Sequence, residues 1–225
     1  MLRNKGDIFS VIAALIVMIT SCSEMDDNYE QFIDSEPTVY LHKVDSARVR
    51  SGRNRVQFEI LPNIDKRVEG YRIFYNFGED SIDTSIPGAD EESLAVIIDE
   101  LDEGIQTFEV VSIGEKELRS LPAEFISSIY GEIYESRLSN RFIKSKEFNE
   151  NELEIGWGDT HGEYAIEIMY TDLNGEKITY KQETPFEESI LENVNKDKPV
   201  SYRTVYKPNE LAVDLFYADE IVLSF

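Results

Sequence analysis

The chain has 225 residues, and its 45 acidic and 22 basic side chains give a formal net charge of −23. Such a charge disfavours binding to nucleic acid and to anionic lipid surfaces, which carry charge of the same sign. The hydrophobic content of 41% is ample for packed cores, and a single cysteine, Cys22, excludes an internal disulfide. The fold must therefore be stable through its core alone.

The N-terminal stretch has the pattern of a secretory signal peptide. Arg3 and Lys5 precede an apolar run over residues 8–20. This run is shorter than the roughly 20 residues that a membrane-spanning helix needs, and it fits the apolar region of a signal peptide. There are two alternative interpretations of Cys22. It is an ordinary residue that follows a cleaved signal peptide, or it is part of a short membrane anchor.

The segment Ile19-Thr20-Ser21-Cys22 resembles the bacterial lipobox, in which small residues admit a peptidase and the thiol receives a diacylglyceryl group. The resemblance implies a signal peptide over residues 1–21 and a lipid on Cys22. Residues 22–39 are then a flexible tether, because the segment is acidic and poor in branched apolar residues.

Three acidic residues follow the cysteine closely: Glu24, Asp26 and Asp27. They resemble the surface-export signal of Bacteroidetes lipoproteins. The alternative is that they belong to a solvated linker.

The first half of the remaining chain has the pattern of short strands. Val56, Phe58 and Ile60 alternate with polar residues, which is typical of a strand with one buried face. Further strands are predicted over these ranges: 71–75, 94–98, 108–113 and 121–130.

The second half repeats this order. Strands are predicted over 153–157, 164–170 and 202–206, with further apolar segments over 211–216 and 221–225. Asn174-Gly175 predicts a two-residue hairpin turn, because both residues tolerate a positive φ. Residues 184–195 are a candidate short helix.

Short strands in two passes predict an all-β chain with two tandem immunoglobulin-like sandwiches. The segments Tyr71-x-Ile73-x-Tyr75, Leu101-x-x-Gly104 and Leu153-x-Ile155-x-Trp157 resemble fibronectin type III modules. The resemblance implies that Trp157 packs in a core. The expected sandwiches cover residues 40–131 and 132–225.

The chain also resembles a family of Bacteroidetes lipoproteins with a domain of unknown function. The likeness rests on residues 22–29, Gly52-Arg53-Asn54-Arg55, residues 72–76 and residues 211–214. Members of that family often accompany outer-membrane glycan uptake systems, so the resemblance implies a context and no reaction. Taken alone, Gly52 and the arginines after it are typical of a turning loop at a solvated edge.

No catalytic or metal-binding pattern stands out. His42 and His161 have no metal-ligand spacing and are expected at the surface, and a G-x-S-x-G turn is absent. Asp172-x-Asn174-Gly175 matches only part of a calcium loop, and the hairpin turn explains it. With 45 acidic residues, carboxylate pairs arise by chance. We therefore expect no enzyme, no cofactor and no metal.

Some aromatic residues do not fit the strand alternation. They are Tyr134, Phe142, Phe148, Phe216 and Tyr217. We expect them at the interface between the sandwiches, and the alternative is a contact with a glycan or a protein partner.

The sequence thus predicts a non-catalytic lipoprotein of the outer membrane, exposed at the cell surface, that assists glycan binding or uptake. Its expected partners are the membrane, through the N-terminal lipid, and a polysaccharide or an outer-membrane protein. One alternative is a structural or adhesin-like protein-interaction module. Another is a carboxylate-dependent glycoside hydrolase.

Overall fold

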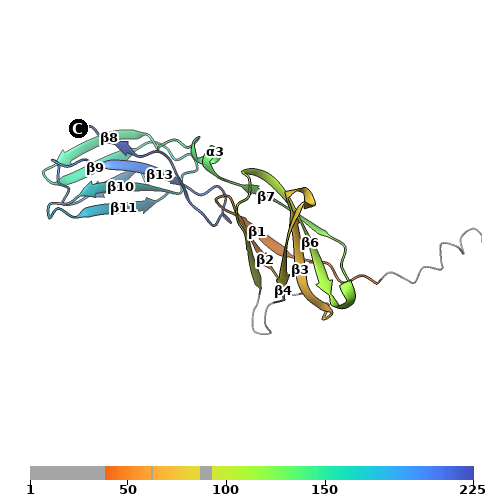
Figure 1. The fold of residues 1–225 in the computed structure, drawn as a ribbon. Coiled ribbons are helices and arrows are strands. Elements are labelled where there is room, and N and C mark those ends of the chain that lie inside the picture. The colour runs from red at the N-terminus through yellow and green to blue at the C-terminus, as the bar shows by residue number, and fades with distance from the viewer. Residues whose placement is uncertain (1–38, 62, 87–92) are drawn as a thin grey trace, which may run out of the picture. The chain divides into compact units, whose positions relative to one another are not determined.

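The computed structural model describes residues 39–61, 63–86 and 93–225 (Figure 1). The predicted signal peptide, the lipobox with Cys22, and the acidic residues Glu24, Asp26 and Asp27 lie outside the described residues. Within them, no helix has both the length and the apolar character that crossing a bilayer requires.

Seven antiparallel strands form the first sandwich. They are β1 (Ala47–Ser51), β2 (Val56–Ile60), β3 (Val68–Tyr75), β4 (Asp80–Ser85), β5 (Leu94–Ile98), β6 (Gly104–Gly114) and β7 (Ala123–Ile129). One sheet has the order β1-β2-β5 and the other the order β4-β3-β6-β7. Their inward faces enclose a core in which the rings of Phe58 and Phe108 meet edge to face, 5.2 Å apart.

Short helical turns join some of these strands. Residues Asn76–Gly78 form the turn η2, residues Glu115–Glu117 form η3, and the helix α3 (Glu132–Glu135) follows the last strand of the first sandwich.

The second sandwich repeats the plan of the first. Its strands are β8 (Ile143–Asn149), β9 (Glu152–Trp157), β10 (Ala165–Thr171), β11 (Lys177–Glu183), β12 (Glu188–Leu191), β13 (Ser201–Tyr206), β14 (Phe216–Tyr217) and β15 (Ile221–Val222). The sheet β12-β9-β8 faces the sheet β11-β10-β13-β14, in which β15 also pairs with β13. Trp157 is 1% exposed and packs on Tyr202 with 5.3 Å between ring centroids.

The predicted fold class is confirmed: the chain is all-β, with two tandem fibronectin type III-like sandwiches. The three inward residues of β2, Val56, Phe58 and Ile60, are each 0% exposed, as the alternation predicted. The core position of Trp157 is confirmed as well. The boundaries 40–131 and 132–225 stay predictions.

Two local predictions are wrong. Residues 184–195 contain the strand β12 and no helix, because Ser189 and Leu191 face the core in alternation and Leu191 pairs with Leu153 of β9. The β10–β11 hairpin has a longer loop than two residues.

That loop follows from the pairing of Thr171 with Lys177. Gly175 has a φ of +87°, whereas Asn174 is not among the residues with positive φ. The carboxylate of Asp172 accepts hydrogen bonds from the backbone N–H groups of Asn174 and Glu176, at 2.9 and 2.7 Å. This turn accounts for the partial resemblance to a calcium loop.

The hairpin gives a first prediction. Gly175→Ala should lower the free energy of unfolding by about 1–2 kcal/mol, because a side chain disfavours the left-handed region. A Cβ there would meet no atom within 4 Å, so the effect is conformational and not steric. Urea denaturation measures it. Asn174→Ala is the control and should cost clearly less, and equal losses would contradict this turn geometry.

Candidate functional site

The segment between β1 and β2 contacts the segment between β13 and β14. Arg55 donates through Nε and Nη2 to the two oxygens of Asp214, at 2.8 and 2.6 Å. The backbone N–H of Arg53 donates to Asp214 Oδ2 at 2.8 Å, and that of Val213 donates to the carbonyl of Ser51 at 2.9 Å. We call these two segments, residues 51–55 and 209–214, together with α3, the junction.

A second ion pair completes the junction. Arg53 holds Glu135 of α3 by two hydrogen bonds of 2.7 Å each. Its guanidinium also lies over the ring of Phe216, 4.6 Å from the centroid. Phe216 is 0% exposed and meets Tyr130 and Tyr134 edge to face. Polar pairs and an aromatic cluster therefore lie side by side here.

Gly52 is required by this close approach. A Cβ on Gly52 would lie 2.5 Å from Asp214 Oδ2 and 2.9 Å from a methyl group of Val213. The expected turning loop is present between β1 and β2, and its arginine side chains are 38% and 37% exposed, but the expectation that Gly52 lies at a solvated edge is wrong, because Gly52 is buried. The sequence signal was present in two separate segments, and only the fold shows that they meet.

The ion pairs shift the acidity of their carboxylates. The hydrogen bond from Arg55 lowers the pKa of Asp214, although burial acts in the opposite direction. The hydrogen bond from Arg53 lowers the pKa of Glu135 in the same way. Both carboxylates are thus stabilised in the charged form.

The structure separates the five aromatic residues that the sequence singled out. Tyr134 of α3 lies in the junction, Phe216 of β14 packs edge to face against Tyr134, and Arg203 lies over the ring of the adjacent Tyr217 at 4.0 Å. Phe148 is partly buried against the core of the second sandwich, and its ring meets the exposed ring of Phe225 edge to face. Phe142 is 71% exposed.

Both histidines of the chain, His42 and His161, are exposed, as expected. Among the described residues, no group of three or more His, Cys, Asp or Glu side chains is arranged to hold a metal ion.

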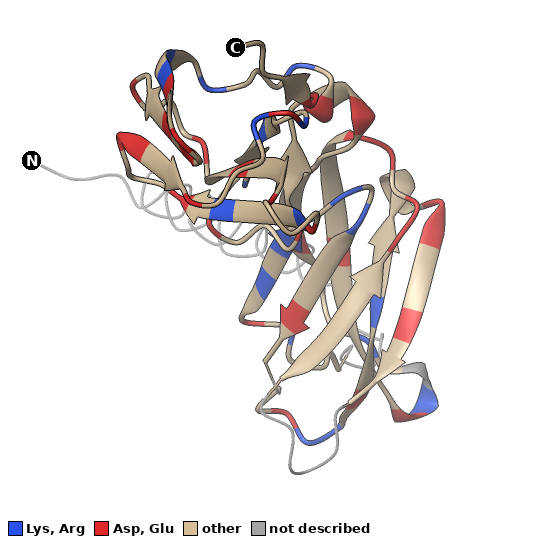
Figure 2. Cartoon of the chain, turned by 90° about the vertical axis from the view of Figure 1, so that its left-hand side faces the viewer, with Lys and Arg blue, Asp and Glu red and all other residues tan. Residues whose placement is uncertain are grey.

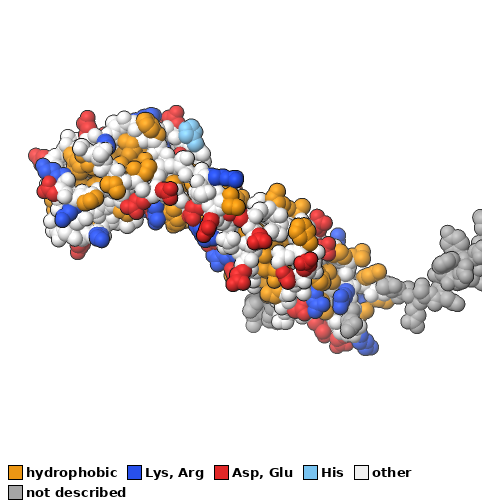
Figure 3. All heavy atoms as spheres, turned by 45° about the horizontal axis from the view of Figure 1, so that its top comes forward, with side chains coloured by type: hydrophobic (Ala, Val, Ile, Leu, Met, Phe, Trp, Pro, Cys, Tyr) orange, Lys and Arg blue, Asp and Glu red, His pale blue; other side chains and the backbone are white. Residues whose placement is uncertain are grey.

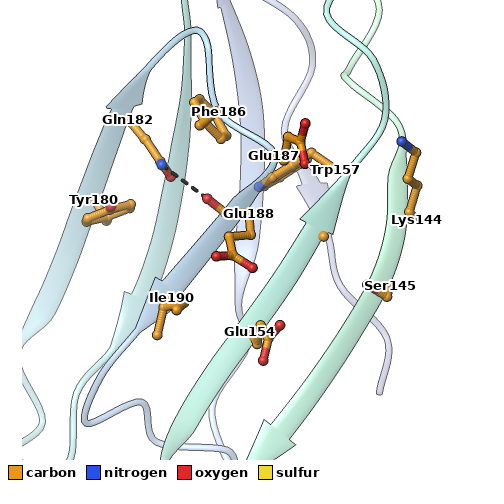
Figure 4. A pocket seen from close by; sticks show the side chains of 11 residues that line it. Lys144, Ser145, Glu154, Trp157, Tyr180, Gln182, Phe186, Glu187, Glu188 and Ile190 are labelled. Carbon is orange, nitrogen blue, oxygen red and sulfur yellow. Dashed lines mark hydrogen bonds between the residues drawn. The ribbon is translucent and has the colours of Figure 1, made fainter.

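The second sandwich carries a hollow of about 680 Å³ on the outer face of the sheet β12-β9-β8 (Figure 4). Gly156 lies in its floor, where a Cβ would clash with Ser145 Oγ. Glu154 and Glu188 project from the neighbouring strands, and Tyr180 stands on the edge strand β11. Rings and hydrogen-bonding groups therefore line the same depression.

Gln182 is held in place within this hollow. Trp157 Nε1 donates to Ser189 Oγ at 2.9 Å, and the Ser189 hydroxyl donates to Gln182 Oε1. Gln182 Nε2 donates to the carbonyl of Glu188 at 3.1 Å. Gln182 was not predicted as a site residue from the sequence, although a polar side chain at the third inward position of β11, after Ile178 and Tyr180, was a visible signal.

A second hollow of about 450 Å³ adjoins the first. The two share Lys144, Trp157, Phe186 and Glu187, so they form one continuous surface depression, which we call the groove. Elsewhere the surface is mixed: basic residues are interspersed with acidic ones along the strands (Figure 2), and hydrophobic side chains lie among charged ones (Figure 3). The groove is the best candidate for a ligand site among the described residues.

The junction gives a second prediction. Asp214→Asn should lower the free energy of unfolding at pH 7 by about 1–2 kcal/mol, since it removes a charge-assisted, partly exposed bidentate pair. A carboxylate with a lowered pKa stabilises the fold above its ordinary value near pH 4, and this contribution is lost as the pH falls further. Urea denaturation at pH 7 and pH 3 should therefore show a smaller difference between variant and wild type at pH 3 than at pH 7.

Asp83→Asn is the matched control, because Arg72 binds Asp83 in a similar pair on the surface, where the carboxylate side chain is 57% exposed. It should cost less than Asp214→Asn. An equal or larger cost for the control would mean that the junction pair does not stabilise the fold beyond an ordinary surface pair.

Two solved structures that are similar to this chain come from chicken. The FN1-FN3 domains of chicken CNTN1 are similar at 9% identity and a TM-score of 0.46, with 84% of this chain and 66% of that chain covered, so this chain spans just under two thirds of it. A two-domain fibronectin type III segment of chicken tenascin is similar at 15% identity and a TM-score of 0.31, with 79% and 95% covered. No curated protein matches. The family profile described as a domain of unknown function, DUF4998, matches residues 22–216, and the chain therefore belongs to the DUF4998 family.

Proposed function

We propose that the protein is a non-catalytic, lipid-anchored binding protein of the outer membrane that holds carbohydrate in the groove of its second sandwich. The observation that carries the proposal is the placement of Gln182 between Tyr180 and Phe186, opposite the carboxylates of Glu154 and Glu188. A sugar offers an apolar face to aromatic rings and hydroxyl groups to amides and carboxylates. Binding sites commonly combine aromatic lining with a few fixed polar groups.

The fixed position of Gln182 matters for this function. Its hydrogen bonds to Ser189 and to the backbone of Glu188 orient the amide before a ligand arrives. Preorganisation reduces the entropy that binding costs. The anchor adds a location: a lipid on Cys22 and a surface-export signal at Glu24, Asp26 and Asp27 would present the groove outside the cell, in support of glycan uptake.

A second candidate is a protein-interaction module. The outer face of the sheet β4-β3-β6-β7 carries exposed apolar residues on its last two strands: Ile105 is 78% exposed and Ile126 is 63% exposed. Their strands pair directly, with Ile126 opposite Thr107. Such exposed side chains favour a contact with another protein surface.

The carbohydrate proposal predicts binding by the soluble fragment from Ser23 to Phe225, which contains every described residue. In a polysaccharide screen, at least one class should bind, and Tyr180→Ala and Gln182→Ala should each weaken that binding by about tenfold, since a stacked ring or a fixed hydrogen bond is worth about 1–1.5 kcal/mol. Calorimetry measures the affinities.

Phe77→Ala is the control, because Phe77 is a fully exposed aromatic residue of the first sandwich and lies outside the groove. It should bind as the wild type does. No binding by a folded fragment would favour the protein-interaction module instead. Release of new reducing ends from a bound polysaccharide would contradict the non-catalytic assignment and favour a hydrolase.

The anchor gives a separate prediction. Cys22→Ala should abolish incorporation of labelled palmitate in a bacterial host, whereas Ser23→Ala should leave it unchanged. Persistent labelling of Cys22→Ala would exclude the lipid anchor. Replacing Glu24, Asp26 and Asp27 by alanine should preserve labelling but reduce protease accessibility on intact cells, and unchanged accessibility would exclude the export signal.

A further inference from the structure

Arg141 is a buried cation without a carboxylate partner. Its side chain lies just before β8, and the residue is 4% exposed. Nε and Nη2 donate to the carbonyl of Gly158 at 2.9 and 2.6 Å, and Nη2 also donates to the carbonyl of Phe186 at 2.9 Å. These acceptors are neutral, and none of the ion pairs among the described residues includes Arg141.

One nitrogen of this guanidinium is unsatisfied. Nη1 is buried and has no hydrogen-bond partner. A buried charge is costly unless it is paired, and a buried donor without an acceptor loses its hydration without compensation. The bonds to Gly158 and Phe186 explain how the side chain is held, but they leave both the charge and Nη1 uncompensated. An anion would satisfy both.

The space for such an anion is the smaller hollow of the groove. Arg141 lines it together with Lys144, Thr160 and Pro185. Its volume of about 450 Å³ lies within the range of roughly 300–1,000 Å³ that small-molecule sites occupy. A second cation and a hydroxyl group therefore border the same space as Arg141.

Two carboxylates also border this hollow, Asp159 and Glu187. Lys144 Nζ reaches Asp159 Oδ1 at 3.3 Å, and both side chains are mostly exposed, at 59% and 85%. Exposed ion pairs of this kind add little to the stability of the fold, so Lys144 can exchange Asp159 for a ligand with a small loss of free energy. The half-buried ring of Phe186 covers one face of the Arg141 guanidinium, with 4.8 Å between the ring centroid and Cζ, and Nη1 is itself buried, so neighbouring side chains must shift before a ligand reaches Nη1.

We propose that this hollow is a subsite for an acidic group of the bound sugar chain, a carboxylate or a sulfate, with Arg141 and Lys144 as its donors. The inference rests on the proposed function and names its ligand class as an acidic polysaccharide. The two hollows share Phe186 and Lys144, so a sugar at Tyr180 continues along the groove towards Arg141. The overall charge of −23 opposes this ligand at long range, but salt screens it beyond about 8 Å.

The test compares three oligosaccharides of equal length with the soluble fragment: an oligogalacturonide, a sulfated galactan and a neutral galactan. Calorimetry at about 0.15 M salt should show that at least one acidic oligosaccharide binds about tenfold or more tightly than the neutral one. Lys144→Ala should weaken that acidic ligand by about five- to tenfold and leave the neutral ligand unchanged. Lys196→Ala removes another exposed charge, outside the groove, and should change neither affinity.

Arg141 is better observed than replaced, because its bonds to Gly158 and Phe186 also hold the fold. In the ¹⁵N-arginine NMR spectrum, the Arg141 side-chain resonance should shift saturably with the acidic ligand and stay in place with the neutral one. The preferred acidic oligosaccharide distinguishes a carboxylate from a sulfate. Equal affinity for acidic and neutral ligands, or an unmoved Arg141 resonance, would overturn the subsite and leave carbohydrate binding intact. No binding to any oligosaccharide or polysaccharide by a folded fragment would overturn both.

Discussion

The carboxylate of Asp214 is the point on which the arrangement of the chain depends. It accepts two hydrogen bonds from the Arg55 side chain and one from the backbone of Arg53, all within 2.8 Å. Charge-assisted bidentate bonds are among the strongest and most directional in proteins. Because these donors belong to one short segment, all three hydrogen bonds form when that segment packs against Asp214. Gly52 makes the approach possible, since it brings no side chain into the gap.

The linker between the sandwiches, which contains α3, is also bound to residues of the first sandwich. Glu103, in the loop before β6, accepts hydrogen bonds from the backbone N–H groups of Ile133 and Tyr134, at 2.8 and 2.6 Å. Glu135, the residue after Tyr134, binds Arg53. These bonds satisfy N–H groups that the start of a helix leaves without partners. The linker is therefore held by hydrogen bonds to the first sandwich.

The sequence predicted the parts that depend on local pattern. Strands such as β2 and β9 were found because one face is fully buried and the period is two. The strand β4 was not found, since its edge position leaves five of six side chains polar, in Asp80–Ser85. The junction could not be predicted, because Arg55 and Asp214 are 159 residues apart and nothing local reports their contact. The groove was missed because its floor is a glycine and its rings, Tyr180 and Phe186, resemble core residues in sequence.

The arginines of this acidic chain have two different environments, and the difference bears on function. Arg53 and Arg55 each form an ion pair with a carboxylate, so their charges are already paired within the junction. Arg141 is more deeply buried than either, yet its side chain donates only to carbonyl groups and its Nη1 has no hydrogen-bond partner. In a chain with 45 acidic residues, a carboxylate partner is the easiest group to supply. Its absence beside Arg141, in a hollow continuous with Tyr180 and Gln182, is the reason to assign that position to the negative charge of a ligand.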